Sequence, residues 1–170
     1  MVDDLGMSAW RRFLEAHAAV VERLSVELER ETAMPLSWYD VLTQLEAAGG
    51  RLRMHELASA VLLSRSGMTR LVDRLEDAGL VQRCPDCEDR RGTVACLTTR
   101  GEDALHAAAP VHLRGIGEHF TQRLDDREKR VLATALRRIA EAATPPRRCA
   151  SGGDPQPASG PLSSSSPRGV

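Results

Sequence analysis

The sequence predicts a mainly α-helical protein that carries one small β-hairpin. Its 170 residues are rich in alanine, leucine and arginine, whereas only 3% are aromatic, and this composition favours helices over a large sheet. Apolar residues recur at spacings of three and four in several segments, which is the period of an amphipathic helix. Two strand-like segments around a turn-rich loop interrupt the helical patterns near residues 80–98.

A long helix is expected at residues 8–31. Its apolar residues form one continuous stripe over about six turns, and the charged residues lie largely off that stripe. A helix of this length usually packs on more than its own small domain. The stripe consists of Trp10, Phe13, Leu14, His17, Val21, Leu24 and Leu28.

Three shorter helices and a hairpin are expected in the middle of the chain. After Pro35, the residues Ser37 and Asp40 resemble a capping box for a helix that ends at Gly49–Gly50. The segment "RLR" is then a short extended connector, and "MHELASAV" is a short helix. Ser64 is the expected N-cap of the next helix, "RSGMTRLVDRLEDAG". The strands "LVQRC" and "TVACLT" flank the loop "PDCEDRRG" and form the hairpin.

Two more helices and a tail follow the hairpin. Thr99 and Glu102 have the spacing of a capping box, and Asp125 and Glu128 repeat it. From Pro145 the chain is dominated by proline, glycine and serine, which bury too little apolar surface to offset the entropy of ordering. A disordered tail is therefore expected. The two helices are expected at about 99–123 and 126–143.

The middle of the chain has the element order of a winged helix-turn-helix: helix, short strand, helix, turn, helix and hairpin. In such a fold the second helix of the pair enters the DNA major groove and places its N-terminal residues against base edges. Here Arg65 and Arg70 are able to reach guanine or phosphate, and hydroxyls at Ser66 and Thr69 are able to hydrogen-bond bases or phosphates. Arg74 is a candidate phosphate contact.

The hairpin tip is the second candidate contact with DNA. Arg90 and Arg91 are expected to enter the minor groove, with Asp89 orienting a guanidinium through charge-assisted hydrogen bonds. Because the net charge is −1, binding relies on such local clusters and not on a global basic field. The alternative is a solvated face balanced by nearby acids. The gathering of arginines at the two places that the fold directs at DNA favours binding.

The run "LASAVLLSRSGMTRLVDRLEDAGLVQR…EDRRGTVACLTTRGEDAL" resembles the MarR family of bacterial transcriptional regulators, and the resemblance covers roughly residues 8–143. It implies a homodimer formed by the first and last two helices, which reads a near-palindromic site in double-stranded DNA. The family's recognition positions fall on Ser66, Thr69 and Arg70, and its wing positions fall on Asp89 and Arg91. Phenolic or aromatic acids, or thiol oxidation, typically release the DNA in that family.

The resemblance predicts a function and a division of the chain into four segments. A ligand-responsive repressor is the favoured function, and a thiol-based redox sensor is one alternative. A winged helix that binds protein instead of DNA is another. The segments are an N-terminal dimerisation helix at 1–35, the winged DNA-binding domain at 36–98, the C-terminal dimerisation helices at 99–144 and the tail at 145–170.

Cys84 and Cys87 depart from the family's pattern at the start of the wing. A structural zinc site needs four ligands, and no second pair is nearby, so no metal is expected. A redox pair whose oxidation distorts the wing is a second interpretation. Small solvent-facing residues are the favoured one. A symmetric hairpin places Cys96 near Val81, away from Cys84, as a buried strand residue.

An effector pocket is a further hypothesis, because aromatic walls with a few polar groups suit small aromatic ligands. The alternative, which is favoured, is that the aromatic residues of the first helix form a dimer core and that Trp38 packs at the domain junction. The candidate pocket residues are Trp10, His17, Trp38 and His112, with Phe13 and Tyr39 beside them.

Other functional classes lack their motifs. The chain has no glycine-rich phosphate loop, no metal-spaced His/Glu pair and no nucleophile elbow, so neither an enzyme nor a cofactor is expected. No secretory signal is recognisable, and no segment approaches the roughly 20 apolar residues that span a bilayer. A cytoplasmic protein without a membrane partner is therefore expected.

Overall fold

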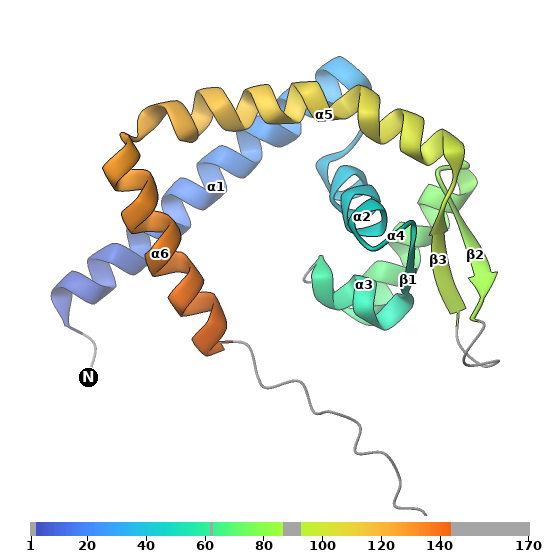
Figure 1. The fold of residues 1–170 in the computed structure, drawn as a ribbon, viewed down its shortest axis with the longest axis horizontal. Helices are drawn as coiled ribbons and strands as arrows, with labels where there is room; N and C mark the ends of the chain where they lie inside the picture. The colour runs from blue at the N-terminus through green and yellow to red at the C-terminus, as the bar shows by residue number, and fades with distance from the viewer. Residues whose placement is uncertain (1–2, 62, 87–92, 144–170) are drawn as a thin grey trace, which may run out of the picture. The chain divides into compact units, whose positions relative to one another are not determined.

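The computed structural model of the protein describes residues 3–61, 63–86 and 93–143. It is mainly helical with one small antiparallel sheet, as predicted (Figure 1). The predicted tail, Cys87 and the wing-tip residues Asp89, Arg90 and Arg91 lie outside the described residues. The elements are α1 (Asp4–Thr32), α2 (Leu36–Ala47), β1 (Arg51–Arg53), α3 (Met54–Ala60), α4 (Arg65–Asp77), β2 (Val81–Pro85), β3 (Thr93–Leu97), α5 (Thr99–His119), the 3-10 turn η1 (Thr121–Arg123) and α6 (Asp126–Ala143).

The first helix begins four residues earlier than predicted. The Asp3 carboxylate accepts a hydrogen bond from the Gly6 amide at 2.6 Å, which caps the first turn of α1. Of the apolar stripe, Leu24 and Leu28 are buried, whereas Trp10 is 54% exposed. The N-terminal half of the stripe is thus an exposed apolar surface of the chain.

Two predicted helix caps are wrong. Helix α2 begins at Leu36 directly after Pro35, and no side chain caps it, so Ser37 lies inside the first turn. Helix α5 is capped by Thr98, whose hydroxyl accepts from the Gly101 amide at 3.0 Å, and not by Thr99. Pro35 occupies the N-cap position with φ −60° and ψ 140°, so the helix begins one residue before the predicted serine cap.

Two predicted caps are confirmed. The Ser64 hydroxyl accepts from the Gly67 amide at 3.1 Å at the start of α4. Asp125 and Glu128 each accept from the other's backbone amide at 2.8 Å, which is the reciprocal capping box expected before α6. Taken by itself, α6 has the predicted bounds, and its apolar residues include Val131 and Ile139, which are exposed.

The core of the winged domain is assembled from one face of each of its helices. Each fully buried leucine or methionine contributes about 1.5–3 kcal/mol to folding. Leu28 of α1 and Leu105 of α5 join this cluster, so both long helices are anchored to the winged domain. The largest fully buried side chains are Leu28, Leu42, Leu45, Leu57, Met68, Leu75, Val41, Val72 and Val81.

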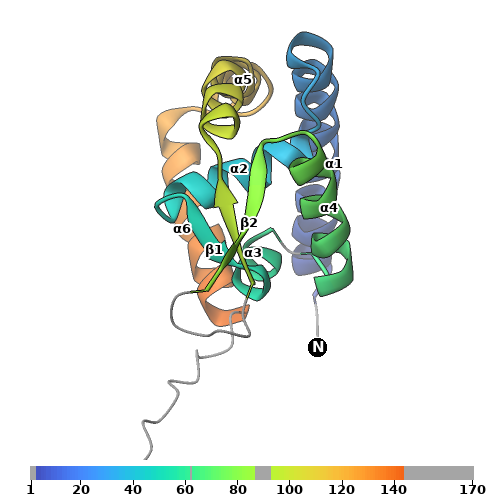
Figure 2. The same ribbon diagram turned by 90° about the vertical axis from the view of Figure 1, so that its right-hand side faces the viewer.

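The small sheet has the order β1–β3–β2, so that the returning strand of the hairpin is central. In Figure 2, α4 lies beside this hairpin. The register places Cys96 opposite Gln82 and Cys84 opposite Val94. The prediction that Cys96 lies near Val81, away from Cys84, is therefore wrong, whereas its burial is confirmed, with 7% of the residue exposed.

Thr98 joins the end of α4 to the start of α5. Besides capping α5, its hydroxyl lies 2.8 Å from the Gly79 carbonyl oxygen and 3.0 Å from that of Leu80, to which it donates. Gly101 packs against the same strand start, since a Cβ there would lie 2.1 Å from the Leu80 carbonyl oxygen. Any side chain at Gly101 would force the two segments apart.

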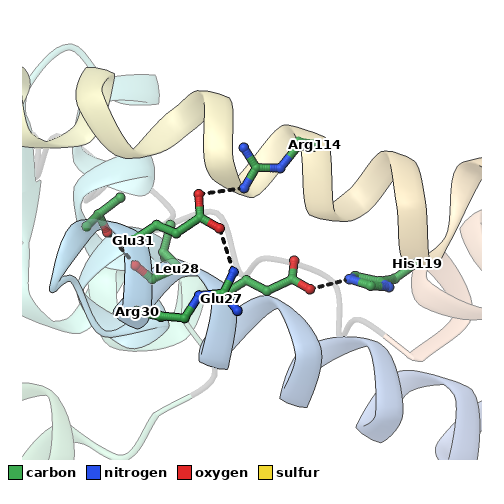
Figure 3. A network of polar contacts seen from close by, with 7 residues as sticks. Glu27, Leu28, Arg30, Glu31, Arg114 and His119 are labelled. Atoms are coloured by element: carbon green, nitrogen blue, oxygen red, sulfur yellow. Dashed lines mark hydrogen bonds and ion pairs between the residues drawn. The ribbon is translucent and has the colours of Figure 1, made fainter.

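Helices α1 and α5 pack against each other at a close approach, where a Cβ on Gly115 would lie 2.7 Å from Leu24 Cδ2. A polar network covers this contact (Figure 3). His119 contacts Glu27 at 2.7 Å, and Arg114 donates to Glu31 at 2.7 Å. The Arg114 guanidinium, together with Arg30, lowers the pKa of Glu31. The long α1 thus packs beyond the winged domain, as its length predicted.

Candidate nucleic-acid interface

Helix α4 separates its residues cleanly into a buried and an exposed face. Met68, Leu71, Val72 and Leu75 are buried in the core. Because helix residues three and four apart share a face, the intervening polar residues point outward. The Ser64 cap fixes where the helix begins and hence which residues occupy its first turn. The outward face carries Arg65, Ser66, Thr69, Arg70, Asp73 and Arg74.

Within residues 3–61, 63–86 and 93–143, the arginines of this face have no acidic partner. Among the described residues, none forms an ion pair with Arg65, Arg70 or Arg74. The two hydroxyls are engaged locally: Thr69 donates to the Arg65 carbonyl oxygen at 3.0 Å, and the Ser66 Oγ lies 3.3 Å from that of Ser64. Three guanidiniums therefore retain their donors for an external acceptor.

Arg83 on β2 is held in the opposite way. Its guanidinium donates to Asp73 at 2.5 Å and also to Glu76, and its backbone amide donates to Glu76 at 3.0 Å. Although burial works against the charge, these carboxylates raise the pKa of Arg83. Asp73 therefore pairs with the hairpin and not with another residue of α4. The pair fastens the hairpin to α4.

A hollow of about 530 Å³ lies between α4 and the root of the hairpin. Asp86 is buried at its edge, and its carboxylate accepts from Arg53 Nε at 2.6 Å, which neutralises the acid. The surface between helix and hairpin is thus concave and offers arginines at its rim. The lining residues are Arg53, Met54, His55, Arg65, Thr69, Asp86 and Thr93.

The predicted redox pair is only partly described. Cys84 lies on β2, and its sulfur is paired with that of Cys96, whose participation the sequence reasoning missed. Their separation of twelve residues gave no signal, because the pairing depends on the register of the hairpin. Cys87 lies outside the described residues.

The four predicted effector residues lie in three different places within the described part of the chain. His112 lines a cavity of about 400 Å³ with Tyr39, and their rings are 4.4 Å apart. Trp10 and His17 are exposed on α1, where Phe13 lies between them. Trp38 packs against the core. The full lining is Tyr39, Asp40, Thr43, Gln44, Ala60, Val61 and His112.

Asp40 is a pocket residue that sequence reasoning had assigned to a helix cap. Burial raises its pKa, and the nearby His112 partly opposes that change. Burial lowers the pKa of His112, and its Nδ1 atom is buried without a hydrogen-bond partner among the described residues. The spacing of Tyr39, Asp40, Thr43 and Gln44 was a readable signal, because it groups polar residues on one side of α2.

Residues 3–61, 63–86 and 93–143 include no helix that has both the length and the apolar character needed to cross a membrane. The same part of the chain contains no group of three or more His, Cys, Asp or Glu placed to hold a metal ion.

Comparisons with known proteins agree with this architecture. A family model described as the MarR family matches residues 34–92. The uncharacterised HTH-type transcriptional regulator YkoM of Bacillus subtilis is 27% identical over 126 residues, which are 74% of this chain and 80% of YkoM.

Two solved structures from Streptomyces coelicolor are more similar. AbsC, a MarR family transcriptional regulator, is 31% identical with a TM-score of 0.76, over 84% of this chain and 96% of AbsC. Sco3205, a MarR family transcriptional regulator in complex with DNA, is 31% identical with a TM-score of 0.78, over 86% of this chain and 92% of Sco3205. Both matches extend well beyond the winged domain. The chain belongs to the MarR family of DNA-binding transcriptional regulators.

Proposed function

We propose that the protein is a cytoplasmic repressor that binds a specific, near-palindromic site in double-stranded DNA as a homodimer. The exposed face of α4 carries this proposal, since Arg65, Arg70 and Arg74 lie there without an acidic partner among the described residues. Guanidiniums on the first turns of such a helix pair with guanine or phosphate. Sco3205 was solved in complex with DNA, which supports the same role here.

The division of labour on α4 follows from position. Ser66, Thr69 and Arg70 lie near the start of the helix and are assigned to base edges, whereas Arg74 lies one turn later and is assigned to phosphate. Each lost base pair of direct readout costs about 1–3 kcal/mol. The wing residues Asp89, Arg90 and Arg91 remain predicted minor-groove contacts on the basis of sequence.

The homodimer is supported by the exposed apolar surface of α1. A soluble monomer rarely exposes a large contiguous apolar patch, and a second copy of the chain is the partner that covers it. Two winged domains related by a two-fold axis would then meet half-sites about 10 base pairs apart. The exposed apolar residues of α1 include Leu5, Met7, Trp10, Phe13, Leu14 and Val21.

The cavity beside His112 is the proposed effector site. Its polar groups are a phenol, a carboxyl group, an imidazole, a hydroxyl and an amide, and among the described residues that line it there is no arginine or lysine. A small aromatic molecule able to donate and accept hydrogen bonds fits this lining better than a carboxylate, because the cavity offers no guanidinium or ammonium partner for a negative charge.

The test begins with selection of bound duplexes from a random pool, followed by fluorescence anisotropy on the selected duplex at two salt concentrations. We expect tight, salt-dependent binding that a scrambled duplex of equal length does not reproduce. Light scattering on the free protein should give the mass of a dimer. Failure to enrich any sequence would instead identify a winged helix that binds protein.

A further inference from the structure

One face of the small sheet carries two cysteines whose sulfur atoms are paired. Cys84 lies opposite Val94 and Cys96 lies opposite Gln82, so the cysteines occupy diagonal positions on adjacent strands. Side chains of directly paired residues, and of residues two apart, leave an antiparallel sheet on the same side. The Cα atoms of Cys84 and Cys96 are 6.3 Å apart, within the range of about 4.4–6.8 Å that a disulfide spans.

The two cysteines differ in their access to solvent. Cys96 lies on the central strand and is 7% exposed, whereas Cys84 lies on β2 and is only partly buried. Oxidation of cysteines is selective for the accessible sulfur. Cys84 is therefore the sulfur that meets a dissolved oxidant, and Cys96 is placed to resolve the product.

We propose that Cys84 and Cys96 form a redox modification site, a dithiol in the reduced protein and a disulfide after reaction with a hydroperoxide, and that the disulfide strengthens DNA binding. The Cys84 thiolate attacks one peroxide oxygen, the O–O bond breaks, and the other oxygen leaves as water or an alcohol. The Cys96 thiolate then attacks the resulting sulfenic acid, the S–O bond breaks, and water leaves. The two thiols lose two electrons and two protons, which the peroxide accepts.

The effect on DNA, which rests on the proposed function, follows from the contacts of β2. Arg83 binds Asp73 and Glu76 on α4, and Asp86 binds Arg53 at the end of β1. Cys84 lies between these two anchors. A bond from Cys84 to the central strand fixes the segment that sets the position of the hairpin relative to α4.

The sign of the effect follows from the register. The sulfurs are adjacent while the β2–β3 pairing is intact, so the bond forms without breaking the ladder. The bond restricts the conformations of the hairpin, which would otherwise lose that freedom on binding DNA. Ordering the equivalent of one side chain before binding makes binding roughly two- to tenfold tighter. A bond between Cys84 and Cys87 would have the opposite effect, because it would distort the hairpin.

The test uses the full chain with Cys87→Ser and Cys149→Ser, so that Cys84 and Cys96 are the remaining thiols, beside the wild type. Each protein is reduced, freed of reductant and treated with hydrogen peroxide. Peptide mass spectrometry then maps disulfides without DNA, and anisotropy measures binding to the selected duplex before and after oxidation. Cys84→Ser removes the pair at the more exposed position, and Cys96→Ala is the second such variant.

We expect a Cys84–Cys96 disulfide in both proteins, with two- to tenfold tighter binding that reductant reverses and that neither variant shows. A wild type that forms a Cys84–Cys87 bond and binds more weakly would overturn the proposal, as would the absence of a disulfide. A Cys84–Cys96 bond that leaves affinity unchanged would overturn the effect on DNA. If the reduced protein prefers no duplex, the proposed function fails with that effect, whereas the mapping still decides the modification.

Discussion

Arginines in two regions of this protein differ in whether they have an acidic partner among the described residues. Between α1 and α5, Arg30 and Arg114 both bind Glu31, so their charges are satisfied within the chain. On α4, Arg65, Arg70 and Arg74 have no ion-pair partner among the described residues. The residue type is the same in both regions. What differs is whether the fold supplies the counter-charge, and that difference separates structural charges from those left for a ligand.

Arg83 sharpens this comparison because it lies next to the exposed face of α4 and yet belongs to the satisfied group. Its two carboxylate partners, Asp73 and Glu76, come from α4 itself. It neutralises acids that would otherwise lie beside the arginines proposed to bind DNA. Because Arg83 offsets Asp73 and Glu76, these two acids do not cancel the positive charges on the exposed face of α4.

The largest effect is expected from Arg70→Ala. Loss of a bidentate contact with a base costs about 1–3 kcal/mol, so affinity for the selected duplex should fall roughly 5- to 150-fold without a change in thermal stability. Arg114→Ala is the matched variant from the satisfied group and should leave affinity near that of the wild type. Anisotropy and thermal melting measure both. Equal losses of DNA affinity in the two variants would contradict the distinction between the two regions.

The contact between α1 and α5 should respond to packing. A Cβ at Gly115 meets Leu24 Cδ2 at 2.7 Å, whereas one at Gly117 meets its nearest neighbour, Gln122 Nε2, at 3.6 Å. Both substitutions by alanine gain the same helix propensity. Gly115→Ala should therefore be less stable than Gly117→Ala by about 1–3 kcal/mol in denaturant unfolding. Indistinguishable midpoints would mean that the close approach is easily relieved.

A smaller effect is expected from Arg83→Gln, which leaves the carboxylates of Asp73 and Glu76 unneutralised beside the DNA. Affinity should fall roughly two- to fivefold, and the loss should shrink in high salt, as expected for exposed charges. The triple variant with Asp73→Asn and Glu76→Gln is the control and should regain affinity. If it does not, Arg83 acts by holding the hairpin and not by neutralising charge.

The smallest effect concerns pH. Burial lowers the pKa of His112 below its ordinary value of 6.5, so the stability tied to its neutral form is complete above 6.5 and is lost as pH falls through the folded-state pKa. The charge of Asp40 opposes this shift. His112→Gln should lose less unfolding free energy than the wild type between about pH 7 and about pH 5. His55→Gln, at an exposed position, is the control variant.

Much of the fold was readable because its signals are local. Apolar periodicity and turn residues placed the α-helices of the described residues, although α5 ends at His119 and the 3-10 turn η1 was not expected. The Ser64 and Asp125 caps were confirmed because a cap needs only a few neighbouring residues. The caps at Ser37 and Thr99 were wrong because competing residues, Pro35 and Thr98, lie one or two positions away. Local rules do not rank such neighbours.

The site was readable only where it lies on one element. The exposed face of α4 follows from helix geometry, whereas the Arg83 pair and the Cys84–Cys96 contact join segments whose register the sequence does not state. The cavity beside His112 combines residues of α2 and the end of α3 with one from α5, more than sixty positions after α2. Its partners depend on packing, which periodicity does not reveal.

The contacts of Thr98 couple any movement of α5 to the end of α4 in the winged domain. Its hydroxyl and Gly101 fasten the start of α5 to the end of α4, and the 21 residues of α5 span about 32 Å. If a rod of that length pivots by about 2° about one end, its other end moves by about 1 Å. In the proposed homodimer, small rotations of the long helices would thus change the distance between the two winged domains. The protein would then select operators by the distance between their two half-sites.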